Sequence, residues 1–236
     1  MKRAPKKLDK ETLKAWLLES RAEILTYFSL QHDWWPSSEE RNQSYATAWA
    51  NALFIKAATE IFPDVNEYAI HCSKGGQDTR SEAVIWYAQQ DGWSPRQIML
   101  DFVVASWGER VPFKLVAESE MYPSTSTAPF YDDGAGYLWD FFKLLVVPCG
   151  YRLFMARVGG RRGGASTIQR MSSVSNQMVE LYSRYHGGLI QADDQLGCII
   201  IPSSAKFRKM SRVLWAENGA LHCEEFSDFS LDSEVE

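Results

Sequence analysis

Two apolar segments in the middle of the chain, residues 98–104 and 113–121, carry acids where a buried strand normally has none. The first segment, IMLDFVV, holds Asp101, and the second, FKLVAESEM, holds Glu118 and Glu120. Because strand side chains alternate between two faces, Glu118 and Glu120 point to the same side. Burying a carboxylate without a partner is costly. The pattern therefore predicts either an exposed strand face or a site that gathers positive charge.

If the two segments pair as neighbouring strands of a hairpin, Asp101 joins Glu118 and Glu120 at one strand end. Three carboxylates in one place repel one another unless a cation lies between them. A ligand set made only of oxygens suits Mg²⁺ or Mn²⁺ better than Zn²⁺. The hairpin therefore predicts a metal site formed by Asp101, Glu118 and Glu120. The alternative is that these acids lie on a solvated face, where glutamates at i and i+2 are common.

The remaining hydrophobic periodicity predicts a chain that mixes helices and strands. Helices are expected at residues 9–30, 44–62, 79–90, 137–145 and 166–185. Strands are expected at residues 66–72, 98–104, 113–121, 151–158 and 197–202, with a closing hairpin at 212–216 and 220–226. Residues 79–90 could instead form a strand, because VIWY favours β structure. This order predicts a mixed α/β fold with a central sheet flanked by helices.

The chain of 236 residues, 45% of them hydrophobic, is long enough to bury a substantial core. We expect an N-terminal helix and linker over residues 1–43, an α/β domain over 44–226 and an acidic tail over 227–236. The net charge of −5 gives no overall support for nucleic-acid binding, although it is compatible with a local basic patch.

The cysteines and the apolar runs predict the compartment of the protein. The four cysteines are far apart in the sequence and match no zinc-binding spacing, so we expect free thiols in a reducing cytoplasm. The basic N-terminus lacks the apolar core of a secretory signal. The longest apolar runs are too short to span a bilayer. We therefore expect a cytoplasmic protein that does not interact with membranes.

In this order of elements, residues 44–158 resemble the PD-(D/E)xK nuclease superfamily, which includes many restriction endonucleases. The core of that family is a helix, a strand hairpin, a second helix and a further strand. One acid lies on the first active strand and (D/E)xK lies on the next. Asp101 matches the first acid, and Glu118-Ser119-Glu120 stands at the second motif. The segments WDFFKLL and YRLFMARV match the following helix and strand. The resemblance implies a restriction-endonuclease-like core.

The sequence departs from the family pattern in two places. Asp101 follows Leu100 instead of a proline, and Glu120 stands where the family has its lysine. That lysine orients the attacking water and counters the charge of the transition state. Lys143, on the next expected helix, is the candidate substitute, and Lys114 is a weaker one. The alternative for Lys143 is an ordinary helix lysine whose stem covers apolar surface.

The resemblance implies metal-dependent hydrolysis of phosphodiester bonds, with Mg²⁺ or Mn²⁺ as the cofactor. Asp101 and Glu118 are then the metal ligands, Glu120 is a third ligand or a base, and Lys143 stabilises charge on the phosphate. Glu60, late in the preceding helix, could be an accessory ligand. The implied role is an endonuclease, such as one in restriction or anti-phage defence. The alternative is a catalytically inactive nuclease fold that serves as a nucleic-acid-binding or protein-interaction subunit, which the Glu120 replacement favours.

Nucleic-acid binding, with DNA favoured over RNA, has to come from local basic segments. The main one surrounds GGRRGG and contains Arg157, Arg161, Arg162 and Arg170. Flexible Gly-Arg segments can follow a phosphate backbone. The alternative is a solvated loop. A homodimer or a protein partner is also compatible with the sequence.

Overall fold

The computed structural model describes residues 6–31, 39–63, 68–72, 100–106, 113–121, 135–159, 166–188, 190–203 and 210–226. Outside these ranges lie the predicted helix at 79–90, the predicted acidic tail at 227–236, and Arg161 and Arg162 of the predicted basic segment.

Within the described ranges, seven strands form one sheet in which the strands follow their order along the chain. The strands are β1 (Tyr68–Cys72), β2 (Phe102–Ser106), β3 (Phe113–Glu120), β4 (Tyr151–Val158), β5 (Gln195–Pro202), β6 (Ser211–Glu217) and β7 (Ala220–Phe226). The pairings are antiparallel from β1 to β3 and parallel from β3 to β5. They are antiparallel again from β5 to β7. The mixed sheet, with helices on its faces, confirms the predicted mixed α/β class.

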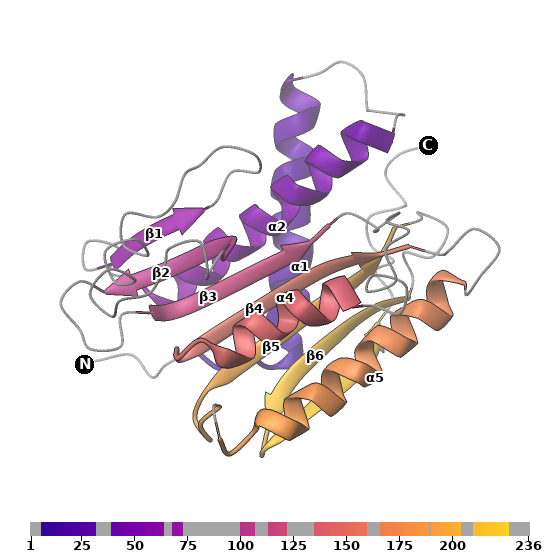
Figure 1. Cartoon of the computed structure of the whole chain (residues 1–236). Coiled ribbons are helices and arrows are strands. Elements are labelled where there is room, and N and C mark those ends of the chain that lie inside the picture. The colour runs from indigo at the N-terminus through magenta and orange to yellow at the C-terminus, as the bar shows by residue number, and fades with distance from the viewer. Residues whose placement is uncertain are drawn as a thin grey trace.

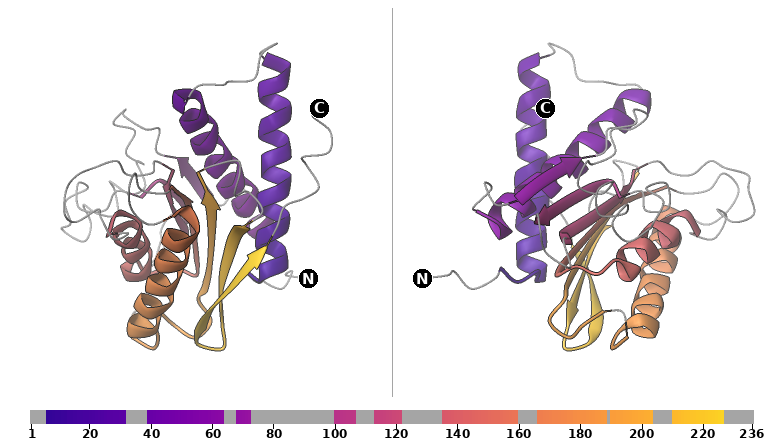
Figure 2. Two further views of the ribbon diagram at one scale, coloured as in Figure 1. Left: turned by 90° about the vertical axis from the view of Figure 1, so that its right-hand side faces the viewer. Right: turned by 60° about the vertical axis from the view of Figure 1, so that its left-hand side comes forward.

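Helices cover both faces of this sheet (Figure 1). They are α1 (Lys10–Gln31), α2 (Glu39–Ile61), α4 (Ala135–Val146) and α5 (Thr167–Tyr185). Seen along the sheet edge, α1 and α2 lie on one face, and α4 and α5 lie on the other (Figure 2). α2 begins at Glu39, earlier than the expected start at Ser44. Among the described residues, no helix combines the length and the apolar character that crossing a membrane requires.

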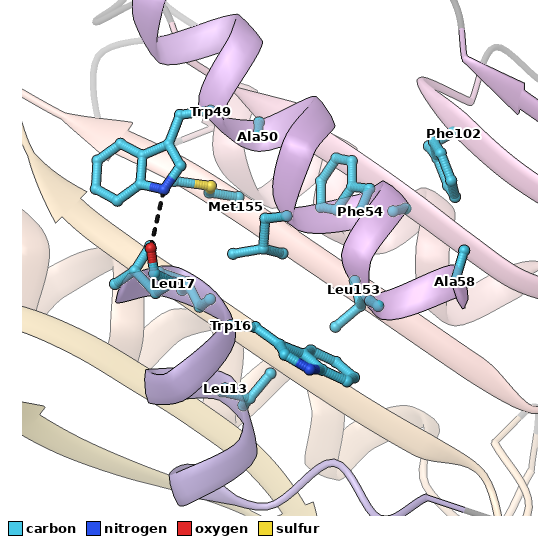
Figure 3. Close-up of a cluster of buried hydrophobic side chains, with 14 of the residues drawn as sticks. Leu13, Trp16, Leu17, Trp49, Ala50, Phe54, Ala58, Phe102, Leu153 and Met155 are labelled. Carbon is cyan, nitrogen blue, oxygen red and sulfur yellow. Dashed lines mark hydrogen bonds between the residues drawn. The ribbon is translucent and has the colours of Figure 1, made fainter. Parts of the chain in front are cut away.

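The face under α1 and α2 holds a large apolar core (Figure 3). Trp16 of α1 and Phe54 of α2 are almost fully buried there. The indole Nε1 of Trp49 donates to the carbonyl oxygen of Leu17 at 3.1 Å, which ties α2 to α1. This burial explains why both helices form, because most helical stability in proteins comes from packing an apolar face. α1 and α2 therefore share one core above the sheet.

The face under α4 and α5 holds the second core, in which Phe141 of α4 meets the ring of Phe154 of β4 edge-on at 5.9 Å. Ser166 starts α5 with a complete capping box, in which it accepts from the backbone of Gln169 and Gln169 caps it in return. At the far edge, Asn218 and Gly219 both have positive φ, which a tight hairpin turn requires. This confirms the predicted closing hairpin of β6 and β7.

Candidate functional site

The pairing of β2 with β3 brings Asp101 next to Glu118. The two strands run antiparallel with Phe102 opposite Ala117. Extending this register by one residue places Asp101 opposite Glu118. Asp101 lies just outside β2, although the sequence placed it within a strand that began at Ile98. Its Oδ2 accepts hydrogen bonds from both the backbone N–H and the Oγ of Ser119, each at 2.9 Å. These two bonds fix the carboxylate of Asp101 at the end of β3.

Glu118 is a buried acid, with only 2% of its surface exposed. Ala117, the preceding residue, faces α2. Because strand side chains alternate, Glu118 faces the opposite side of the sheet, which packs against α4. Its Oε1 is 2.8 Å from the ammonium nitrogen of Lys143, an ion-pair distance. Burial raises the pKa of Glu118 to about 9, and the nearby charge of Asp101 adds to the increase while Lys143 opposes it. Burial and the charge of Asp101 therefore favour the protonated form of Glu118, whereas Lys143 favours its carboxylate form.

Lys143 reaches this acid from α4 and contacts a second acid there. Its Nζ lies 2.9 Å from the Oδ1 of Asp140, three residues earlier on the same helix. Burial would lower the pKa of Lys143, but Glu118 and Asp140 together outweigh it and raise the pKa above its usual value. The ammonium group therefore keeps its charge at neutral pH. The sequence analysis missed Asp140, which the three-residue spacing from Lys143 on a helix could have revealed.

Glu120 lies two residues beyond Glu118, at the partly buried end of β3. It is close enough to act on Tyr137, whose pKa is raised to about 12 by burial and, to a smaller extent, by Glu120, against the opposing charge of Arg170. Among the described residues, no group of three acidic, histidine or cysteine side chains is arranged to hold a metal ion. Extending the register of β2 and β3 places Asp101 opposite Glu118, and Glu120 lies two residues farther along β3.

Two of the four predicted nucleic-acid-binding arginines are described, and both make contacts within the protein. Arg157 donates from Nη2 to the carbonyl oxygen of Ser203 at 2.9 Å. Arg170 is buried over the ring of Tyr137, 5.8 Å from its centroid, and donates from Nη1 to the carbonyl oxygen of Gly159 at 3.2 Å. Both side chains lie near the carboxyl end of β4. Arg161 and Arg162 lie outside the described residues.

The remaining candidates are not part of this group. Glu60 pairs with Lys6 and, at 3.2 Å, with Lys56 on the α1 and α2 side. Although burial opposes the effect, these partners hold the pKa of Glu60 at about 2. Lys114 lies near the start of β3, at the strand end away from Glu118.

Comparison of the chain with models of known protein families, with curated protein sequences and with solved structures yields no match.

Proposed function

We propose that this chain is a metal-dependent nuclease that hydrolyses phosphodiester bonds in nucleic acid, with DNA as the preferred substrate. One observation carries the proposal. Asp101, Glu118 and Lys143 come from three different segments and meet at one end of β3. Two adjacent carboxylates and one ammonium group are the set that the PD-(D/E)xK resemblance requires, with the lysine supplied by the following helix.

The order and direction of the elements also support the proposal. A helix, α2, precedes the antiparallel strands β1, β2 and β3, and α4 then leads to β4, which is parallel to β3. This is the sequence of helix, strand hairpin, helix and strand that the resemblance implies for residues 44–158. Glu118 lies on β3 and Asp101 immediately precedes β2, so the two acids lie on adjacent segments of that hairpin.

The donor chemistry of the site fits Mg²⁺ or Mn²⁺. Mg²⁺ is commonly bound by one or two carboxylates, with water and substrate phosphate completing its shell. Asp101 and Glu118 would be those two ligands, and Glu120 would be an outer ligand or a water-orienting base. The pKa of Glu118 is raised by burial and by the charge of Asp101, and a divalent cation at the site would favour the ionised carboxylate. When bound, the ion would lower the pKa of a water molecule and polarise the scissile phosphate.

The protein groups would then hold the reacting parts in place. Ser119 keeps the carboxylate of Asp101 in one orientation through its N–H and its Oγ. The ammonium group of Lys143, held at Glu118, would stabilise the negative charge that develops on the phosphoryl oxygens. The basic segment that contains Arg157, Arg161, Arg162 and Arg170 would supply the positive charge that attracts the nucleic-acid backbone.

A second candidate function is a nuclease fold without catalysis that binds nucleic acid or a partner protein. The observation that favours it is Glu120 at the position of the family's lysine. An acid there adds negative charge beside Asp101 and Glu118 instead of countering that of the substrate. Under this alternative, the Lys143–Glu118 pair only neutralises a buried acid, and cleavage is absent.

The test is cleavage of single- and double-stranded DNA and RNA by the purified protein with Mg²⁺ or Mn²⁺, and with EDTA. We expect metal-dependent cleavage that the Asp101→Ala/Glu118→Ala double mutant loses. The matched control is Glu19→Ala/Glu60→Ala, which removes two paired acids from the opposite face and should retain cleavage. Absence of cleavage on all substrates, with no metal binding by calorimetry, would overturn the nuclease proposal. Salt-dependent binding of nucleic acid would then favour the second function.

A further inference from the structure

Lys143 is shared between two carboxylates that belong to different elements. Its Nζ lies 2.8 Å from Glu118 on β3 and 2.9 Å from Asp140 on its own helix. The two acids differ in burial, because Glu118 is 2% exposed and the side chain of Asp140 is 19% exposed. The ammonium group thus lies between a buried acid and a partly solvated one.

The two contacts have different consequences for a metal-binding site. Glu118 is one of the two proposed metal ligands, so the same carboxylate would have to serve both Lys143 and the ion. Asp140 has no such second role, and its spacing on α4 keeps it beside Lys143. When Glu118 turns toward a metal ion, Asp140 is therefore the partner that can still hold the ammonium group.

The helix that carries this pair is attached to β4 at both of its ends. Near its start, the hydroxyl of Tyr137 donates to the carbonyl oxygen of Arg157 at 3.1 Å. At the end of α4, the buried Arg152 of β4 donates two hydrogen bonds. Its Nε donates to the carbonyl oxygen of Leu144 at 2.8 Å, and its Nη2 donates to the carbonyl oxygen of Val147 at 3.0 Å. Because α4 is fixed to β4, which pairs with β3, a contact within α4 also defines where Lys143 lies relative to Glu118.

We propose that Asp140 is a positioning residue that orients Lys143 over the site, an inference that rests on the proposed nuclease function. Asp140 acts through Lys143 and does not itself touch the metal ion or the substrate. Its removal affects the chemical step and leaves metal affinity and substrate binding as they were. Residues that orient a catalytic group are typically worth about 10- to 100-fold in activity.

The first test is a kinetic cycle with Asp140→Asn, Lys143→Met and the double mutant. We expect Asp140→Asn to lower kcat by about 10- to 100-fold with KM and Mg²⁺ affinity unchanged. The same substitution should cause no further loss in the Lys143→Met background, and Asp140→Glu should restore part of the activity. Glu180→Gln, which removes the exposed helical pair with Arg184 on α5, is the matched control and should leave kcat unchanged.

The second test needs neither metal nor cleavage. The ¹⁵N signal of a lysine ammonium group is sharp only when hydrogen bonds restrain it. We expect a sharp ammonium signal from Lys143. The signal is assigned to Lys143 because it should disappear in Lys143→Met. Asp140→Asn should broaden or shift that signal, and Glu180→Gln should leave it unchanged.

The two tests separate the failure of each proposal. If the wild-type protein cleaves nothing, the nuclease proposal fails, and the ammonium signal alone decides whether Asp140 holds Lys143. If Asp140→Asn lowers kcat equally with and without Lys143, or leaves both kcat and the ammonium signal unchanged, the positioning role is overturned.

Discussion

The two faces of the sheet use charge in opposite ways. On the face of α1 and α2, the acids pair at the protein surface, as Glu19 and Glu60 do with Lys56. On the face of α4 and α5, the strands themselves carry buried charged groups, Glu118 on β3 and Arg152 on β4. Both faces also have a large apolar core of similar composition.

Surface pairs and buried charged groups differ in what they contribute to stability. Surface pairs contribute little, typically about 0–1 kcal/mol. A buried carboxylate costs free energy unless it is paired, and replacing such a pair by apolar groups is often neutral or stabilising. Glu118 is therefore hard to explain by stability alone. Substitutions on the two faces test this contrast.

The largest effect should be the same on both faces. Phe54 and Phe141 are each fully buried, one in each core. We expect Phe54→Ala and Phe141→Ala each to lower the free energy of unfolding by about 3–5 kcal/mol, because each leaves a cavity. Urea unfolding followed by circular dichroism measures this. A loss confined to one variant would show that one of the helix layers adds little to stability.

The next effect should differ sharply between the faces. Lys143 and Lys56 are matched, with side chains 20% and 18% exposed and two acidic partners each. We expect Lys143→Met to lower kcat for nucleic-acid cleavage by about 10²–10³-fold, as for loss of one charge-stabilising donor. Lys56→Met should retain full activity. Equal activity of the two variants would remove Lys143 from the proposed mechanism.

The pH dependence of stability should have opposite signs on the two faces. The pKa of Glu118 is raised to about 9, so its stabilising contribution is complete at low pH and is lost as the pH rises toward 9. The pKa of Glu60 is lowered to about 2, so its contribution to folding stability is present at neutral pH. This contribution is lost as the pH falls below the pKa that Glu60 has in the unfolded chain. We therefore expect Glu118→Gln to flatten the stability profile between the ordinary pKa of a glutamate and about pH 9, and Glu60→Gln to flatten it below that ordinary pKa.

Urea midpoints measured without metal from pH 3 to pH 9 test this prediction. The slope from Glu118 should approach at most about 1.4 kcal/mol per pH unit. The slope from Glu60 should be smaller, because its side chain is 31% exposed and solvent screens it. If the wild type and Glu118→Gln had the same slope between the ordinary glutamate pKa and about pH 9, the assignment of a raised pKa to Glu118 would be contradicted.

The smallest effect concerns the contact between α1 and the sheet. A Cβ atom added at Gly197 would lie 2.6 Å from Cδ2 of Leu13, so the leucine would have to move. We expect Gly197→Ala to lower the free energy of unfolding by about 1 kcal/mol, at the mild end of overpacking. Gly150→Ala is the control, because its nearest contact would be 3.9 Å away. A thermal melt of both variants measures the difference.

Most helices and strands could be predicted from the sequence because their patterns are local. The strand at residues 151–158 and the helix after Ser166 match the structure closely, since alternation and capping are set by neighbouring residues. Asp101 was misplaced within a strand. Its side chain accepts from Ser119, a contact that only strand pairing creates.

The sequence alone determined the fold class, the acidic hairpin and the choice of Lys143 as a candidate. The tertiary structure adds that Lys143 lies against Glu118 and that Asp140 shares its ammonium group. The physical reason is distance along the chain. Hydrophobic periodicity reports the face of one element, whereas the meeting of β3 with α4 depends on how the packed layers bring distant segments together.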